Sequence, residues 1–456
     1  MKCRHLFVLF SALSQGYARF TGSPVKRSLG TATVSLAMPS GTPEHLGSGV
    51  LYGVPINDGQ VSTQIPDHFF TEMGYNFGRA GGSAWPEPNR GWSVSPSEYT
   101  FRFQSALSNY RTARKFGASF FLLSSDLWAN VVDSTPFPGD NGDWTYYDDF
   151  LTQLISDIQA NDMTEGLIID IWNEPDIAGF WARDQSQYRE MWGRTYHRLK
   201  ADLPGVSLAG PSASSGPSSE NAVFTGWAEF VGANQSVPDV YTWHALNPAT
   251  SPTQEADYFA TQRSNLGLPS RPININEYLA YGEVGPSPLV YYLAQFERLG
   301  IRGLRANWAK GGEDAFALHN YLANLLGPQG ATSGYYPNGE WQVYKYYAAM
   351  GGERVATTPS SDGVLEVYAT TGSPIKVLTS ARQSTGTYSI TMTGFSAVGI
   401  TGQVTKRSLG FTWNDVFGEV GDPVDFGTEV HTIVDDAVTF DVIPRTTTEA
   451  YAFEFS

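Results

Sequence analysis

Residues 168–181, IIDIWNEPDIAGFW, contain a mainly apolar run that stops at an acidic residue followed by a proline. A short apolar run of this kind is typical of a strand buried on both faces. Pro175 ends the run, because proline lacks the N–H that a strand or a helix needs to continue. Glu174 therefore lies at the end of a buried strand. Two interpretations are open: the glutamate belongs to a helix cap or a solvated turn, or it is a catalytic carboxylate, which requires a second carboxylate elsewhere.

Seven more apolar runs occur along the chain and alternate with longer amphipathic stretches that we predict to be helices. Alternating strands and helices produce parallel strands, and eight such units predict a closed (β/α)8 barrel, or TIM barrel, over residues 48–350. A doubly wound open sheet is the alternative, disfavoured because no glycine-rich phosphate-binding sequence follows the first run. The predicted strands are residues 49–56, 76–80, 119–123, 166–172, 206–210, 240–244, 272–276 and 303–308, and the predicted helices include residues 99–116, 147–160, 185–203, 222–232 and 286–299.

After the barrel the pattern changes to alternating or β-branched runs broken by Gly, Ser and Thr. Examples are VLEVYATTG, GTYSITMTGF and DAVTFDVI. This pattern predicts an antiparallel β-sandwich over residues 351–456. Residues 28–47 hold one more strand-like run, ATVSLAM, which we expect to join this sandwich.

The N-terminus resembles a secretory signal peptide over residues 1–18, since Lys2 and Arg4 precede a short apolar run and then small residues. Residues 19–27 are a candidate propeptide that ends at the dibasic pair Lys26-Arg27. The apolar run is too short to span a bilayer, and no other candidate span is found in the sequence. We therefore expect a secreted, extracellular protein without a membrane anchor. The sequon Asn234-Gln235-Ser236 predicts a glycoprotein.

The formal net charge is -16, which argues against nucleic acid as a partner, because phosphates need a basic surface. It also favours neutral over polyanionic glycans. The single cysteine, Cys3, falls inside the predicted signal, so no disulfide and no thiol nucleophile is expected in the mature chain. The seven histidines form no recognisable metal motif, and we expect neither metal nor cofactor. The oligomeric state is left open.

Two of the predicted strands end in glutamate: Glu174 ends the fourth strand and Glu277 ends the seventh. In a barrel of this kind the chemistry takes place at the C-terminal ends of the strands. Cleaving a glycosidic bond with retention of configuration needs one carboxylic acid and one carboxylate about 5–5.5 Å apart. Either glutamate alone is better explained as structural, whereas the two together predict a catalytic pair.

These residues carry a resemblance to a known group of enzymes. Asn173-Glu174 on the fourth strand with Glu277 on the seventh resembles the catalytic arrangement of glycoside hydrolase clan A. Within the clan, IWNEPDIAGFW, VSLAGPSAS, WAEFVGANQSVPDVYTWHALNP and LPSRPININEYLAYGE are most similar to glycoside hydrolase family 39, which includes β-xylosidases and α-L-iduronidases. One departure is Asn276, where family members commonly have Thr before the nucleophile.

The resemblance implies a role for each matching residue. Glu174 would be the acid/base, with its pKa raised by the neighbouring nucleophile, and Glu277 would be that nucleophile. Asn173 would bind the sugar 2-hydroxyl. His244 matches a position near the nucleophile, and a neutral histidine of the barrel wall is the alternative. Arg79 would donate to Glu277 or instead pair with an acid such as Asp126.

Other residues are expected to contact the sugar. Tyr278 would hold the nucleophile or pack beneath the sugar. Aromatic residues make up 14% of the chain, and aromatic rings stack on pyranose faces, although core packing explains most individual rings. The tryptophans placed near the sugar are those in or next to the long loops that follow barrel strands, where specificity usually varies, namely Trp85, Trp92, Trp128, Trp181 and Trp308.

The sequence thus predicts a secreted retaining glycoside hydrolase that uses two glutamates in a double displacement. Its expected substrate is a plant or microbial polysaccharide or oligosaccharide, cleaved in a xylosidase-like, arabinosidase-like or endo-acting manner. Two alternatives stay open: a non-catalytic glycan-binding barrel protein, and a transglycosylase that uses the same glutamate pair.

Overall fold

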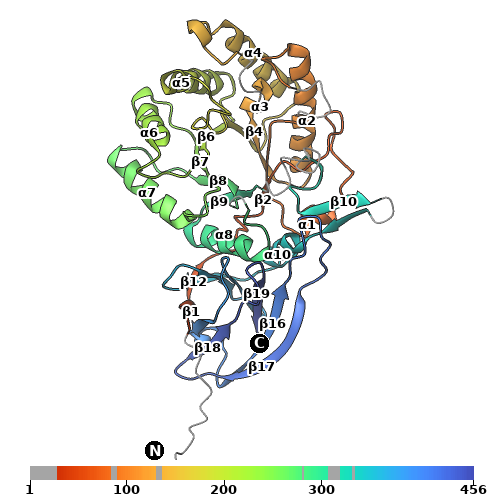
Figure 1. The fold of residues 1–456 in the computed structure, drawn as a ribbon, viewed down its shortest axis with the longest axis vertical. Coiled ribbons are helices and arrows are strands. Elements are labelled where there is room, and N and C mark those ends of the chain that lie inside the picture. Colours follow the sequence, from red (N-terminus) through yellow and green to blue (C-terminus); the bar gives the residue numbers. More distant parts are fainter. Residues whose placement is uncertain (1–27, 84–89, 130–135, 280–281, 307–318, 331–333) are drawn as a thin grey trace, which may run out of the picture.

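The computed structural model describes residues 28–83, 90–129, 136–279, 282–306, 319–330 and 334–456. The predicted signal peptide and propeptide, as well as Trp85 and Trp308, lie outside the described residues. Two layers of the molecule are evident in Figure 1: a barrel surrounded by helices, and a β-sheet domain packed beneath it against α8 and α10 (Gly339–Ala348). No helix among the described residues has both the length and the apolar composition needed to cross a membrane.

The barrel has eight parallel strands and closes through the pairing of its first strand with its last. The predicted (β/α)8 barrel is therefore confirmed, and each strand overlaps one of the eight apolar runs. Its strands are β2 (Gly49–Leu51), β3 (Phe77–Ala80), β4 (Ser119–Leu123), β5 (Leu167–Asp170), β6 (Ser207–Ala213), β7 (Val240–Ala245), β8 (Ile273–Tyr278) and β9 (Arg302–Arg305).

The helices around the barrel begin at caps that can be seen in the sequence. Ser95 and Ser251 each accept a hydrogen bond from a backbone N–H in the first turn, and a proline follows each serine at the first helical position. The surrounding helices are α2 (Pro96–Lys115), α4 (Thr145–Ala160), α5 (Gln185–Asp202), α6 (Ala222–Asn234), α7 (Pro252–Asn265) and α8 (Pro286–Leu299), with the shorter α1 (His68–Thr71) and α3 (Ser124–Trp128) between strands.

The second domain is one nine-stranded sheet that is mostly antiparallel. The sheet curls so that its edge strand β18 faces β19 near the other edge: Phe440 of β18 lies 4.9 Å from Phe453 and 5.6 Å from Phe455 of β19, measured between ring centroids. The predicted sandwich is thus a single folded sheet. Its strands are β1 (Thr31–Gly41), β12 (Arg354–Thr358), β13 (Leu365–Thr370), β14 (Ile375–Ala381), β15 (Tyr388–Thr393), β16 (Gln403–Phe411), β17 (Val424–Thr432), β18 (Ala437–Val442) and β19 (Ala450–Phe455).

One strand of this sheet comes from the other end of the chain. β1 contains the run ATVSLAM and lies between β12 and β15, antiparallel to the first and parallel to the second. The pairing with β15 is a departure from a purely antiparallel sandwich. Because β1 precedes the barrel in the sequence, the sheet domain is completed by segments from both sides of the barrel.

Candidate active site

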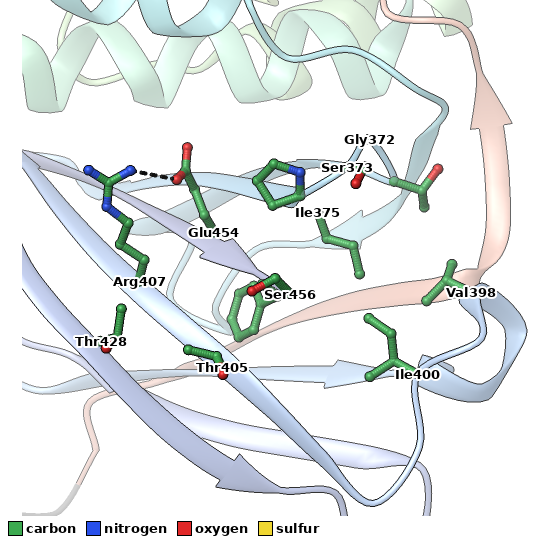
Figure 2. A pocket seen from close by; sticks show the side chains of 13 residues that line it. Gly372, Ser373, Ile375, Val398, Ile400, Thr405, Arg407, Thr428, Glu454 and Ser456 are labelled. Atoms are coloured by element: carbon green, nitrogen blue, oxygen red, sulfur yellow. Dashed lines mark hydrogen bonds and ion pairs between the residues drawn. The ribbon is translucent and has the colours of Figure 1, made fainter.

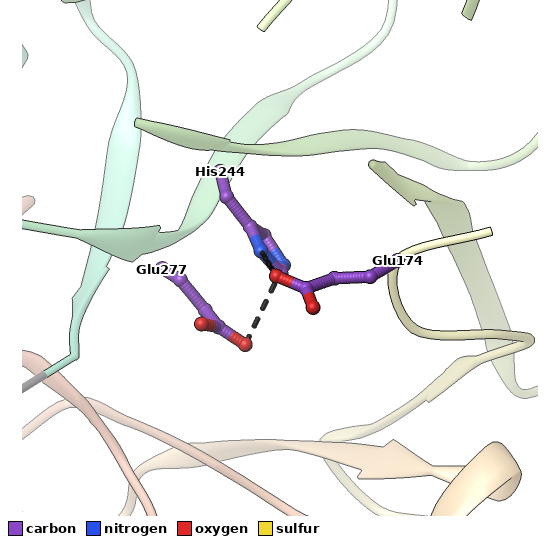
Figure 3. Close-up of side chains that lie close together, drawn as sticks. All are labelled: Glu174, His244 and Glu277. Carbon is purple, nitrogen blue, oxygen red and sulfur yellow. Dashed lines mark hydrogen bonds and ion pairs between the residues drawn. The ribbon is translucent and has the colours of Figure 1, made fainter. Parts of the chain in front are cut away.

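Four strand ends bring a cluster of polar side chains to one rim of the barrel. Arg79 comes from β3, Asn173 and Glu174 follow β5, His244 is on β7 and Glu277 is on β8. All barrel strands run in the same direction, so their C-terminal ends meet at one rim although the residues are far apart in sequence. Figure 3 shows Glu174, His244 and Glu277 pointing toward one another.

Two irregularities in the strands help to point these side chains inward. Between β7 and β8 the register skips Asn276, and between β6 and β7 it skips Ser212. In a regular strand, neighbouring side chains point to opposite faces, whereas a bulge lets two successive residues face the same side. Asn276 and Glu277 thus both contact groups inside the barrel.

Glu174 is held in an unusual backbone conformation. Its φ is 48°, in the left-handed region that non-glycine residues seldom occupy. Its N–H donates to the carbonyl of Ser212 at 2.9 Å, and its carbonyl accepts from the N–H of Ile177 at 3.1 Å. Backbone strain of this kind persists where the surroundings over-determine it, which is common at functional sites.

The two glutamates lie close together on either side of His244. One carboxylate oxygen of each glutamate and a ring nitrogen of His244 all lie within 4.8 Å of one another. Nδ1 of His244 is 3.0 Å from Oε1 of Glu174, and Nε2 is 3.5 Å from Oε1 of Glu277. All three side chains are buried.

Arg79 connects several of these side chains through hydrogen bonds. Its guanidinium donates to Oε1 of Glu277 at 2.6 Å, to Oδ1 of Asn173 at 2.6 Å and to Oδ2 of Asp170 at 3.0 Å. Buried arginine and carboxylate groups are stable only when paired in this way. Arg79 therefore does not pair with Asp126, which was the structural alternative. Asp126 is paired instead with Arg102 at 3.3 Å and with the hydroxyl of Tyr52.

A deeper polar layer was not identified from the sequence. Asp170 is fully buried and accepts hydrogen bonds from Ser212 Oγ and Asn276 Nδ2, each at 2.8 Å. Ser212 in turn lies 2.7 Å from Thr242. The departure at Asn276 has a structural explanation here, because its amide links β8 to β5 and β6. The available signal was Asp170 itself, an acid inside the apolar run before Glu174.

The charges of these groups differ because their surroundings differ. The pKa of Glu174 is raised to about 7, first by burial and second by the charge of Asp176, while Arg79 opposes the rise. The expected cause, the charge of Glu277, is not among the causes of this rise, and the repulsion between the two carboxylates instead acts, after burial, to raise the pKa of Glu277. Burial lowers the pKa of His244 to about 4, so the imidazole is neutral. Burial also raises the pKa of Glu277 above its ordinary value, and His244 and Arg79 oppose this.

Four of the predicted sugar contacts are buried in the core instead. Tyr278 is fully buried, and its hydroxyl donates to the carbonyl of Gly47 at 2.9 Å and contacts Tyr344, away from the barrel interior. Trp128 is buried and donates to the carbonyl of Pro136, and Trp181 is buried and donates to the carbonyl of Asp184. The large apolar area of these rings explains the result. Trp92 is likewise buried.

Glu174, His244 and Glu277 form the one group among the described residues that is spaced as metal ligands are. Carboxylate and imidazole are suitable ligands for zinc. These side chains already have partners, however, because His244 contacts Glu174 and Glu277 forms an ion pair with Arg79. A cation here would have to compete with the positive charge of Arg79.

Two cavities differ in their relation to the glutamates. A cavity of about 650 Å³ lies in the β-sheet domain, where the ion pair of Arg407 with Glu454 forms part of its lining (Figure 2). A second cavity of about 440 Å³ is lined by Asp176 and by residues that follow β6 and β7. Only the second adjoins the residues at the barrel rim.

The chain joins a TIM barrel to a mostly antiparallel β-sheet domain, and solved structures of glycoside hydrolases share this fold. No family model and no curated protein matches the chain at the level of sequence. The fold is similar to that of N2152 from Neocallimastix frontalis, with a TM-score of 0.74 and 19% identity over 94% of this chain and 99% of that chain.

Two further solved structures are similar. The GH39 enzyme from Xanthomonas axonopodis pv. citri has a TM-score of 0.58 and 14% identity, over 96% of this chain and 99% of that chain. A monomeric β-xylosidase from Caulobacter crescentus has a TM-score of 0.57 and 14% identity, over 93% of this chain and 99% of that chain. The resemblance to family 39 structures is therefore confirmed for the fold.

Proposed function

We propose that the protein is a retaining glycoside hydrolase in which Glu277 is the nucleophile and Glu174 is the acid/base. The observation that carries this proposal is the separation of the two glutamates, whose facing oxygens lie within 4.8 Å. Retaining enzymes hold their carboxyl groups about 5–5.5 Å apart, whereas inverting enzymes leave about 6.5–9.5 Å for a water molecule.

The electrostatics support the same assignment. A group that must donate a proton near neutral pH needs a raised pKa, and burial raises the pKa of Glu174 to about 7. Glu277 is the carboxylate nearer to a permanent positive charge, since Arg79 lies 2.6 Å from its Oε1. In the first step Glu277 attacks the anomeric carbon while Glu174 protonates the leaving oxygen. In the second step Glu174 removes a proton from water, which attacks the glycosyl-enzyme ester and releases Glu277.

Neutral His244 and Asn173 complete the proposed site. With the pKa of His244 lowered to about 4, its ring carries one proton and adds no charge between the glutamates. Asn173 has its Oδ1 occupied by Arg79, which leaves its amide nitrogen Nδ2 to donate to a sugar hydroxyl. We further propose a secreted enzyme acting on neutral glycans, in a xylosidase-like, arabinosidase-like or endo-acting manner, as the acidic chain favours.

Mutation of each glutamate tests the roles. Glu277→Ala is expected to lower kcat by on the order of 10⁴-fold or more, because the covalent step is lost. Glu174→Ala is expected to retain cleavage of an aryl glycoside with a good leaving group and to be accelerated by azide, which replaces the water that the base would activate. Normal turnover in either variant would contradict the assignment.

The stereochemical course is a separate test. Proton NMR of the wild-type reaction, recorded before mutarotation, is expected to show the released sugar with the anomeric configuration of the substrate. First appearance of the opposite anomer would rule out the double displacement even if both glutamates proved essential.

A further inference from the structure

The cavity lined by Asp176 is formed by segments that follow three barrel strands. It has a volume of about 440 Å³, and its polar lining includes Asp176 after β5, Ser214, Ser218 and Glu220 after β6, and Asn247 and Thr250 after β7. No residue of β8 or of the described loop after it contributes to the lining. The cavity is thus connected to the segment that carries Glu174 through Asp176, and neither glutamate of the proposed pair lines it.

Asp176 connects this cavity to the proposed acid. Its two carboxylate oxygens accept from the backbone N–H and the hydroxyl of Ser214 at 2.8 and 2.9 Å. It lies two residues after Glu174 and raises the pKa of that residue through its charge. In a retaining glycosidase the acid protonates the leaving oxygen, so the leaving group departs on the side of the acid. Through Asp176, the cavity adjoins the segment that carries the acid.

The lining is rich in hydrogen-bond acceptors and has one sign of charge. Asp176 and Glu220 line it together with Glu255, which is buried and accepts from Trp243 at 2.9 Å and from Thr250 at 2.7 Å. The described lining residues include no lysine, arginine or histidine and no aromatic ring. Such a surface suits the hydroxyl groups of an uncharged sugar or the ammonium group of an amino sugar, and it repels a carboxylate or sulfate.

The floor and the outer wall of the cavity are held in place. A Cβ on Gly216 would lie 2.3 Å from the carboxyl carbon of Glu255, so only glycine lets the chain lie directly on this side chain. The wall at Thr250 is supported from the β-sheet domain, where Arg382 donates to the Thr250 carbonyl at 3.3 Å. Arg382 is itself paired with Glu283 at 2.7 Å.

We propose that this cavity is the leaving-group subsite of the enzyme and that it selects uncharged or cationic saccharides over anionic ones. The proposal rests on the proposed function, because only a glycosidase has a leaving group to place there. It adds a preference that the catalytic pair alone does not determine.

The charge preference can be measured with three disaccharides that share the sugar hydrolysed by the enzyme and carry glucose, glucosamine or glucuronic acid as the leaving group. The wild-type enzyme is expected to show a kcat/KM about tenfold or more lower for the glucuronic acid compound than for the glucose compound. Glu220→Lys replaces a negative charge of the lining by a positive one and is expected to reduce this discrimination about tenfold. A tenfold change corresponds to about 1.4 kcal/mol of altered interaction. Glu229→Lys, an equal charge change at an exposed position of α6 outside the lining, is the matched control.

A steric pair of variants tests the same position without changing charge. Ala222→Trp fills the cavity from the start of α6, whereas Ala233→Trp adds the same ring at the exposed far end of that helix. Relative to cleavage of the glycosyl fluoride, whose leaving group is one atom, Ala222→Trp is expected to lower cleavage of the glucose disaccharide about tenfold. Ala233→Trp is expected to leave this ratio as in wild type.

The outcomes separate the two proposals. One outcome is that the enzyme cleaves aryl glycosides or glycosyl fluorides, but Glu220→Lys leaves the charge discrimination and Ala222→Trp leaves the disaccharide-to-fluoride ratio as in wild type. This outcome would overturn the leaving-group subsite alone. Absence of cleavage with every glycoside would overturn the proposed function, and the subsite with it. A changed ratio in the control variants as large as in the cavity variants would also overturn the subsite.

Discussion

Glu174 combines three features that rarely occur together: a positive φ of 48°, a buried carboxyl and an acidic neighbour at Asp176. The first directs the side chain toward His244 and Glu277, and the other two raise its pKa. The positive φ strains the local backbone, and burial and the charge of Asp176 destabilise the ionised carboxylate. None of the three features benefits folding. Their presence at one residue is expected of an acid that must hold its proton near neutral pH.

The pH dependence of kcat/KM should follow from these pKa shifts. The proposed mechanism needs Glu174 protonated, so activity is expected to fall as the pH rises through about 7. The proposed mechanism also needs Glu277 ionised, and because burial raises the pKa of Glu277, the acid limb is expected above the ordinary pKa of a glutamate. A profile on an aryl glycoside that stays flat to well above pH 7 would contradict the role of Glu174.

Asp176→Asn tests the source of the raised pKa. The amide keeps the shape of the side chain but removes the negative charge that favours protonated Glu174, so the basic limb of the profile is expected to move to lower pH. Glu229→Gln, which removes an equal charge on the outer side of α6, serves as the control and is expected to leave the limb in place. A shift of the basic limb to higher pH in Asp176→Asn would show that the sign is wrong.

The residues of the candidate site lie at or just after the C-terminal ends of the barrel strands, so the strand ends determine their positions. The bulges at Ser212 and Asn276 turn successive side chains of β6 and β8 inward, and the resulting contacts of Asp170 with Ser212 and Asn276 join β5, β6 and β8. The helices contribute stability, and their start points depend on serine caps such as Ser95, whose hydroxyl accepts from the N–H of Glu98.

Loss of the Ser95 cap should weaken α2. Ser95→Ala is expected to lower the stability of the barrel by about 1 kcal/mol, the usual cost of removing a serine cap. Ser186→Ala, at an exposed first-turn position of α5 where Asp184 is the cap, is expected to have little effect. Thermal denaturation followed by circular dichroism compares the two, and equal melting temperatures would contradict the cap.

At the scale of the molecule, the β-sheet domain is joined to the barrel through buried charges as well as apolar packing. α8 packs against β13 and β14. Arg298 of α8 makes a bidentate pair with Glu366 of β13, at 2.6 and 2.8 Å, and the Glu366 side chain is 3% exposed. Arg382 makes a second such link through Glu283. The sheet domain thereby supports the loops that follow β7 and β8.

Breaking the first of these links should destabilise the whole protein. Arg298→Met leaves a buried carboxylate unpaired, which is expected to cost about 3–5 kcal/mol, whereas the double variant Arg298→Met/Glu366→Met is expected to recover much of that loss. Differential scanning calorimetry gives the comparison. A double variant no more stable than Arg298→Met would show that the loss comes from packing and not from the unpaired charge.

The sequence by itself determined the order of strands and helices and the place of the two glutamates. Eight apolar runs separated by amphipathic stretches fit only a few parallel architectures, and Glu174 and Glu277 end two of these runs. Parallel strands share one C-terminal rim, so residues at strand ends are brought together whatever their separation in sequence. The proximity of Glu174 and Glu277 could be predicted for this reason.

The tertiary structure alone decided which side chains face the interior and which partners they meet. In a parallel sheet covered on both faces, inward and outward residues are equally apolar, so hydropathy does not distinguish them. Tyr278 therefore lies in the layer outside the barrel while its neighbour Glu277 faces inward, and Trp128 and Trp181 are buried against other aromatic rings. The placement of His244 between the glutamates, the contacts of Arg79 and the insertion of β1 beside β15 depend on register and on bulges, which are settled by contacts between distant segments.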